Sequence, residues 1–178
     1  MKTALVIIFL CGFSVFSAIV KNELRIGKSP LATLTVGQAM PDFTLRDPAG
    51  VETTLSKVTA EKKLVMINFW ASWCAPCRLE MPGFEKLYTS KNKDGFVILA
   101  VNEDEERSKL DAYLKEKPLT FPVLLDPDSA LMKQFGVRAL PTTILVGGDG
   151  KILEVIEGVQ EYLEYSVEAN LKADPNKK

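Results

Sequence analysis

Residues 64–82 read LVMINFWASWCAPCRLEMP, and the hydrophobic pattern within them changes from that of a strand to that of a helix. The first seven residues are almost all apolar, which is typical of a central strand covered on both faces. Pro76 stands where the first turn of a helix tolerates a residue without an N–H group. Apolar residues then recur at helical spacing, at Met81, Phe84, Leu87 and Tyr88. The stretch predicts a strand-to-helix junction with two cysteines at the start of the helix.

The two cysteines of this junction, Cys74 and Cys77, have a direct chemical use. A sulfur at a helix start lies near free backbone N–H groups and the positive end of the helix dipole, which stabilise a thiolate. Cys77 follows one turn later, close enough to form a disulfide with Cys74. The predicted mechanism is attack of Cys74 on a substrate disulfide, followed by resolution of the mixed disulfide by Cys77. The alternative interpretation is a purely structural cysteine pair.

Composition excludes most other chemistries. The chain has 178 residues, no histidine and three cysteines. Without histidine there is no Ser-His-Asp triad, no Cys-His nucleophile and no imidazole metal ligand. The third cysteine, Cys11, lies in an apolar N-terminal run and is interpreted as a small hydrophobe. Two thiolates cannot complete a four-ligand zinc site without carboxylates. We therefore expect no metal and no cofactor, the redox group being the Cys74–Cys77 pair itself.

Charge and the N-terminal segment set expectations about partners and location. The net charge of −1 gives no basic face for nucleic acid. No charged residue occurs between Lys2 and Lys21, and residues 4–20 would form a helix about 26 Å long. This segment predicts either an uncleaved signal anchor in the membrane or a signal peptide cleaved after small residues. The remainder of the protein is then expected on the extracytoplasmic (periplasmic) side.

The rest of the chain alternates between strand-like and helix-like patterns. A β-hairpin is expected around the turn at residues 47–50, and later strands at 96–101, 121–125, 142–146 and 152–156. One helix is expected to begin with the acidic run 103–106, a second after the capping residue Asp126, and a third around residues 162–171. The acidic run is interpreted as favourable charge at a helix N-terminus. The pattern predicts an α/β fold with a mixed sheet. Predicted boundaries are 1–20 anchor or signal peptide, 21–36 linker, 37–172 catalytic domain, and 173–178 tail.

Three blocks of sequence resemble a known family. They are residues 68–82, residues 121–126 (FPVLLD) and residues 136–143 (GVRALPTT). Together they resemble the TlpA/ResA/CcmG-like branch of the thioredoxin superfamily, whose members are membrane-anchored thiol–disulfide oxidoreductases. The resemblance covers about residues 37–172. It implies a thioredoxin-like fold, a mixed central sheet flanked by helices, with an N-terminal β-hairpin and a helical insertion near residues 103–118.

The same resemblance implies where substrates bind. Pro141 matches the cis-proline of the family, which faces the cysteines and, with Leu140, positions the backbone of a substrate. Trp73, Ala75 and Pro76, which belong to the cysteine motif, are expected to complete the contact surface. Trp70 is expected to pack in the core.

Two further positions concern proton transfer. Glu80 matches an acidic residue that in ResA-like proteins tunes cysteine acidity or moves protons. Because Glu80 follows Cys77 by three residues, the two side chains share one face of the helix. The alternative for Glu80 is a solvated carboxylate near a helix N-terminus. Asn68 stands where thioredoxin has a buried aspartate that assists proton transfer. Because Asn cannot ionise, that role is absent or falls to Glu80 or water.

The resemblance implies a reductase of disulfides in exported proteins, fed by a membrane thiol-electron donor, with apocytochrome c as a specific client. The main alternative is a general periplasmic disulfide reductase or oxidase unrelated to cytochromes. A peroxiredoxin-like peroxidase is less favoured because Ala71 stands where that group has Thr. A copper-delivery protein would need a wider cysteine spacing and a histidine ligand.

Overall fold

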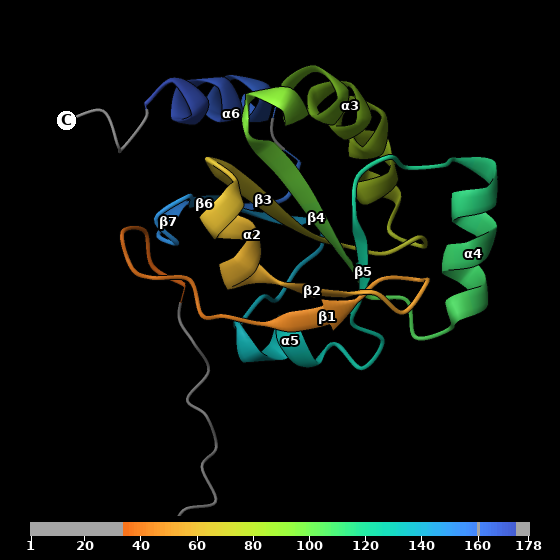
Figure 1. The fold of residues 1–178 in the computed structure, drawn as a ribbon. Coiled ribbons are helices and arrows are strands. Elements are labelled where there is room, and N and C mark those ends of the chain that lie inside the picture. The colour runs from red at the N-terminus through yellow and green to blue at the C-terminus, as the bar shows by residue number, and fades with distance from the viewer. Residues whose placement is uncertain (1–33, 160, 174–178) are drawn as a thin grey trace, which may run out of the picture. The chain divides into compact units, whose positions relative to one another are not determined.

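A computed structural model describes residues 34–159 and 161–173, which form a seven-stranded mixed sheet with helices on both faces (Figure 1). The strand order is β2-β1-β5-β4-β3-β6-β7. The strands are β1 (Thr44–Arg46), β2 (Glu52–Thr54), β3 (Leu64–Trp70), β4 (Phe96–Asn102), β5 (Val123–Leu125), β6 (Thr142–Gly147) and β7 (Ile152–Glu157). The helices are α2 (Leu55–Glu61), α3 (Ala75–Lys91), α4 (Arg107–Glu116), α5 (Ala130–Gln134), α6 (Leu163–Lys172) and the short 3-10 helix η1 (Asn92–Asp94).

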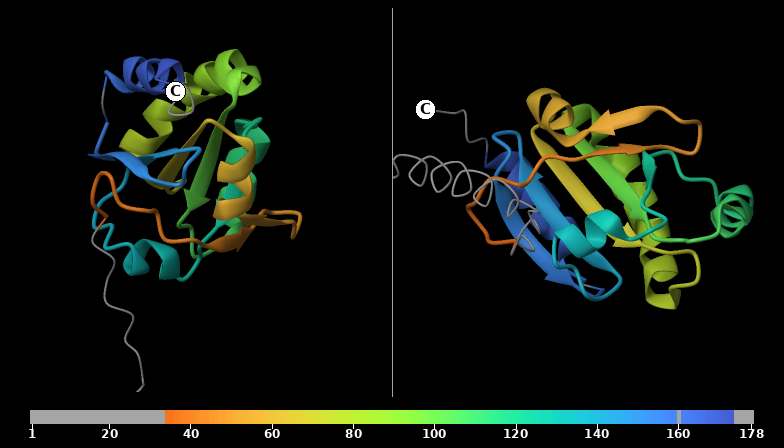
Figure 2. Two further views of the ribbon diagram at one scale, coloured as in Figure 1. Left: turned by 60° about the vertical axis from the view of Figure 1, so that its left-hand side comes forward. Right: turned by 90° about the horizontal axis from the view of Figure 1, so that it is seen from below.

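The central strands β3 and β4 are buried along their whole length and divide the core into two layers. They pair in parallel, and β3 pairs antiparallel with β6 on its other side. Successive side chains of a strand point to opposite faces, so Met66 and Trp70 face one layer while Ile67 and Phe69 face the other. Helices α3, α4 and α6 supply the first layer, and α2 and α5 the second. Figure 2 shows α3 and α6 across the sheet from α2 and α5.

The first described residues attach to the far edge of the sheet. The N–H groups of Gly37 and Met40 donate to the carbonyls of Ile152 and Gly150, each at 2.8 Å. Hairpin β1–β2 then adds to the opposite edge, where Arg46 pairs with Leu125 of β5. Segments that precede the cysteine motif therefore complete the sheet on both sides.

The predicted N-terminal segments lie almost wholly outside the described residues, so the anchor or signal peptide at 1–20 and the linker at 21–36 stay predictions. Within residues 34–159 and 161–173, no helix combines the length and the hydropathy that crossing a bilayer requires.

The predicted fold class is confirmed, including the hairpin, the buried strand 64–70, the closing strand pair and the helical insertion. The predicted cap of α5 is also present, because the Asp126 carboxylate accepts the N–H groups of Ala130, Leu131 and Met132 at 2.9–3.0 Å. Gly136 follows this helix with a φ of 66°, a conformation that glycine adopts without strain.

Two local predictions are wrong. Helix α2 is absent from the predicted elements, because only nine residues separate β2 from β3 and the one apolar residue that α2 buries fully, Leu55, fits the pattern of the returning strand. Helix α4 begins at Arg107 and not within the acidic run. Glu103 and Asp104 instead continue from β4 into the interior, and the Glu103 N–H donates to the Trp70 carbonyl at 2.9 Å. Their carboxylates therefore do not serve as solvated charge at a helix start.

Candidate active site

Cys74 and Cys77 form a disulfide at the junction between β3 and α3. Cys74 is the N-cap of α3, and its sulfur accepts the N–H group of Cys77 at 3.3 Å. Pro76 lies in the first helical turn, where its missing N–H leaves no hydrogen bond unmade. Cys74 is 5% exposed, whereas Cys77 is completely buried. The junction thus presents one sulfur toward the surface and keeps the other inside.

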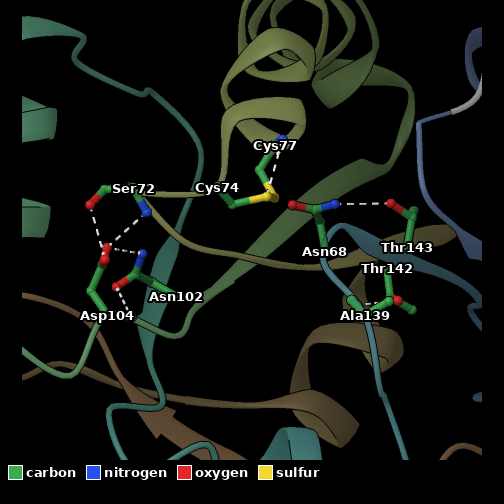
Figure 3. The surroundings of a disulfide bond; sticks show 9 residues. All are labelled: Asn68, Ser72, Cys74, Cys77, Asn102, Asp104, Ala139, Thr142 and Thr143. Atoms are coloured by element: carbon green, nitrogen blue, oxygen red, sulfur yellow. Dashed lines mark hydrogen bonds between the residues drawn. A yellow bond between two sulfur atoms is a disulfide. The ribbon is translucent and has the colours of Figure 1, made fainter.

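The loop that carries Cys74 is fastened to the end of β4 by a buried carboxylate (Figure 3). Asp104 accepts the backbone N–H of Ser72 at 3.0 Å and its hydroxyl at 2.9 Å. The amide of Asn102 donates to the same carboxylate at 2.8 Å. Hydrogen bonds to a charged group are stronger than neutral ones, so this network fixes the turn just before Trp73 and Cys74. Asp104 could not be identified from the sequence, because it belongs to the acidic run 103–106, which resembles a helix start.

The predicted substrate-binding residues surround the disulfide. The Leu140–Pro141 bond is cis, as the resemblance implies. Leu140 lines a surface pocket together with Trp73 and Cys74, although it lies far from these two residues in the sequence. Trp73 is 63% exposed, an unusual position for so large an apolar side chain, and Ala75 and Pro76 are exposed beside it. Trp70, in contrast, is buried and packs edge-on against Tyr113 with ring centroids 5.2 Å apart.

Glu80 is buried on the same face of α3 as Cys77, so it is not the solvated carboxylate of the alternative interpretation. The side chain is 9% exposed, and Oε2 has no hydrogen-bond partner among the described residues. Burial disfavours the charged form and raises the pKa of Glu80 to about 7. Glu80 lines a second pocket with Leu79 and Val159. The group can therefore change its protonation state near neutral pH within one helical turn of a cysteine.

A second buried acid, Glu103, was not expected near the site. It lines the same pocket as Cys74, is 4% exposed, and neither carboxyl oxygen has a partner in hydrogen-bonding geometry within the described chain. Burial raises the pKa of Glu103 to about 8, and the neighbouring Asp126 carboxylate adds to the rise. The sequence does not indicate that Glu103 is buried, because the run 103–106 resembles an exposed helix start.

Asn68 lies in β3 beneath the disulfide, completely buried. Its Nδ2 donates to the hydroxyl of Thr143 at 2.9 Å. In the described part of the chain, no three His, Cys, Asp or Glu side chains lie close enough together to hold a metal ion. The expectation that the enzyme uses no metal and no cofactor stays a prediction. The chemistry that this arrangement itself offers is exchange between a disulfide and two thiols, with acids at hand to move protons.

Comparison with known proteins leads to the same chemistry. The family profile described as AhpC/TSA matches residues 36–155. A protein named thiol-disulfide oxidoreductase ResA from Geobacillus thermodenitrificans is 32% identical over 160 residues, covering 89% of this chain and 86% of the relative. The protein of the same name from Bacillus subtilis is 30% identical over 159 residues, covering 88% of this chain and 83% of the relative.

Solved structures agree with the sequence relatives. A Chlorobium tepidum protein described as a thiol:disulfide interchange protein DsbE superposes with a TM-score of 0.72 at 31% identity, covering 80% of this chain and 99% of that one. The thioredoxin domain of a thiol-disulfide oxidoreductase from Bacteroides vulgatus superposes with a TM-score of 0.70 at 25% identity, covering 78% and 99%. The chain therefore belongs to the AhpC/TSA family of thioredoxin-like proteins and, within it, is a thiol–disulfide oxidoreductase of the ResA and DsbE type.

Proposed function

We propose that this enzyme is an extracytoplasmic reductase of disulfides in exported proteins, in which Cys74 attacks and Cys77 resolves. The observation that carries the proposal is the unequal burial of the two sulfurs. Cys74 borders a surface pocket and caps a helix, where a thiolate is stabilised. Cys77 is inaccessible from solvent and can react only with a sulfur already attached to Cys74.

The proposed cycle begins with the reduced enzyme. The Cys74 thiolate attacks a substrate disulfide, so that one S–S bond forms between enzyme and substrate and the substrate bond breaks. The departing substrate thiolate takes up a proton from solvent. Cys77 then gives its proton to ionised Glu80, and its thiolate attacks the sulfur of Cys74 to form the enzyme disulfide. The bond between Cys74 and the substrate breaks, and the departing substrate thiolate takes the proton from Glu80, which is ionised again. The substrate gains two electrons and two protons, and a membrane thiol-electron donor restores the enzyme dithiol.

Substrate binding is assigned to the pocket beside Cys74. Trp73 and Leu140 line this pocket with Cys74, and Trp73 offers a large exposed apolar surface there. The peptide bond between Leu140 and Pro141 is cis. Buried aromatic surface contributes much of the binding energy in protein complexes. A disulfide presented on an extended segment of an unfolded protein fits between these residues, whereas a folded protein with a buried disulfide does not.

Location and client rest on the N-terminal sequence and on the relatives. The apolar run at residues 4–20 supports export and attachment to the membrane. In an oxidising compartment a dithiol stays reduced only if electrons are supplied, which fits a reductase fed through the membrane. The resemblance of the motif blocks to the TlpA/ResA/CcmG-like branch supports apocytochrome c as the specific client, and other exported disulfide proteins are the broader set.

Replacing Cys77 with Ala is expected to trap clients, because a mixed disulfide on Cys74 can no longer be resolved. The full-length variant would be purified from cells without reductant, and its disulfide-linked partners identified by mass spectrometry. Apocytochromes among the partners would support the specific client, and a varied set of exported proteins the general reductase. The double variant Cys74→Ala/Cys77→Ala controls for other attachments. Absence of partners from the single variant, or equal recovery from the double variant, contradicts the mechanism.

Replacing Glu80 with Gln is expected to change the titration of the reduced cysteine pair. In the wild type a carboxyl with a pKa of about 7 ionises near the sulfurs, and its negative charge disfavours the thiolate. The Gln variant should therefore form the Cys74 thiolate at a pH lower by about one unit, in a single step. Thiolate absorbance and alkylation rates measure both changes. Glu164→Gln is the matched control, since Glu164 is an exposed acid on the rim of the same pocket. Identical titrations of wild type and Glu80→Gln would remove Glu80 from the mechanism.

A further inference from the structure

Asn68 places a polar side chain in the apolar layer that contains the cysteines. Its neighbours on the same face of β3 are Met66 and Trp70, which belong to the cluster that also includes Cys74 and Cys77. Asn68 is completely buried there. A buried amide costs free energy unless both its N–H and C=O groups find partners. The partners of Asn68 are therefore of direct interest.

One end of the amide is held firmly, and the other end has no partner. Asn68 lies directly opposite Thr143 in the antiparallel register of β3 and β6, and Nδ2 donates to the threonine hydroxyl at 2.9 Å. Oδ1 is buried and accepts no hydrogen bond within the described chain. Figure 3 shows the side chain extending from β3 toward the disulfide, with its oxygen on the side of the sulfurs and its nitrogen toward Thr143. The unsatisfied acceptor thus points at the redox group.

The oxidation state of the cysteines decides whether this acceptor can be satisfied. A disulfide carries no hydrogen, so neither sulfur can donate to Oδ1. A thiol carries an S–H group, which is a weak donor. When the disulfide takes up two electrons and two protons from an external dithiol, one of those protons resides on the sulfur of Cys77, inside the same apolar layer. Reduction can therefore supply the missing donor.

We propose that Oδ1 of Asn68 accepts a hydrogen bond from the Cys77 thiol in the reduced enzyme, and that Thr143 positions the amide for it. The bond favours the dithiol over the disulfide. It also keeps the proton on Cys77 while Cys74 ionises, which makes Cys74 the attacking sulfur. This inference deepens the proposed mechanism and rests on it for the order of attack, but the effect on the dithiol equilibrium does not depend on any client.

Asn68→Leu tests the equilibrium, because leucine keeps much of the volume and removes the acceptor. The ratio of dithiol to disulfide in the full-length protein would be measured in dithiothreitol redox buffers. We expect it to fall by about tenfold, equal to about 30 mV toward a more reducing potential. Thr143→Val removes the hydroxyl that holds the Asn68 amide, so it should lower the ratio of dithiol to disulfide by a smaller factor. If Asn68→Leu does not fold, Thr143→Val provides the test.

Thr142→Val is the matched control for these variants. Thr142 is also a buried threonine of β6, but its hydroxyl donates to the Ala139 carbonyl at 2.8 Å, and its neighbour in the register is Phe69. Its ratio should equal that of the wild type. An unchanged ratio in Asn68→Leu, or an equal shift in Thr142→Val, overturns the proposal.

The infrared S–H stretching band of Cys77 provides a readout that loss of stability cannot imitate. The band is isolated by subtracting the spectrum of reduced Cys77→Ser from that of the reduced wild type. In the wild-type background the band is expected at the lower frequency of a hydrogen-bonded thiol. When the same subtraction is made between Asn68→Leu and Asn68→Leu/Cys77→Ser, the band is expected at a higher frequency. A band at the same frequency in both backgrounds contradicts the hydrogen bond even if the equilibrium shifts. Failure to trap clients with Cys77→Ala would leave both measurements intact and would contradict only the proposed function.

Discussion

Replacing Cys74 with Ser is expected to lower disulfide-reductase activity by on the order of 10³-fold or more, the scale on which loss of a covalent nucleophile acts. A serine hydroxyl does not ionise near neutral pH, even at a helix N-cap. Cys77 cannot take over the attack, because its side chain is fully buried in the apolar layer that α3 forms with the sheet. The geometry therefore assigns the whole first step to one sulfur.

Reduction of a small disulfide protein, followed in the presence of dithiothreitol as electron donor, measures this loss. Cys11→Ser is the control, because Cys11 lies outside the catalytic domain predicted from the sequence and should leave the rate unchanged. Retention of substantial activity by Cys74→Ser would show that Cys77 attacks substrates directly, and would reverse the order of the two cysteines. Loss of activity in both variants would mean that Cys11 has a role in turnover.

The parts of the fold that the sequence predicts are those encoded by local patterns. The apolar run 64–70 has the length and composition of a buried strand, and the cysteine spacing with Pro76 marks the start of the helix after it. Cis-Pro141 and the contact surface around Trp73 came from the family resemblance, because no local property of Leu140-Pro141 distinguishes a cis bond from an ordinary turn.

The parts that could not be predicted depend on contacts between distant segments. Glu103 and Asp104 belong to a run of four acids that looks like a solvated helix start. Their burial follows from the extension of β4 beside Trp70 and from the return of Ser72, thirty-two residues earlier, to the Asp104 carboxylate. Nothing in the local pattern separates these two acids from Glu105 and Glu106, which are exposed.

Three buried polar groups adjoin the active-site motif in ways that complement one another. Asn68 cannot ionise and offers only an acceptor, Glu80 has a pKa of about 7, and Glu103 has a pKa of about 8. Each has at least one oxygen without a partner in the described chain. Unsatisfied buried groups destabilise a fold, and their concentration at the redox site is typical of functional positions. The free energy of unfolding is therefore lower than it would be if these three positions were apolar.

Replacing Glu103 with Gln is expected to raise the free energy of unfolding relative to the wild type, by an amount that grows with pH. The pKa of Glu103 is about 8 in the folded protein, against an ordinary value of 4.5 in the unfolded chain. Between these values the unfolded chain has released the proton and the folded protein still holds it, so stability falls as pH rises from about 4.5 to about 8. Gln cannot ionise and removes this fall. The groups that face Glu103 are Asp126, which raises its pKa, and Ser129 and Lys133, which oppose the rise.

Urea unfolding of the oxidised protein at a series of pH values measures the effect. At about pH 4 the variant should match the wild type or be slightly less stable, because the Gln amide is also buried without a partner. By about pH 9 the difference in unfolding free energy should have moved in favour of the variant by on the order of 4 kcal/mol. Glu105→Gln, at the exposed position two residues on, should follow the wild type at every pH. A constant difference between Glu103→Gln and the wild type from acid to alkaline pH would mean that Glu103 is already ionised in the folded protein. Glu103 could then not be a neutral acid beside Cys74, and the pocket would carry a fixed negative charge that opposes the thiolate.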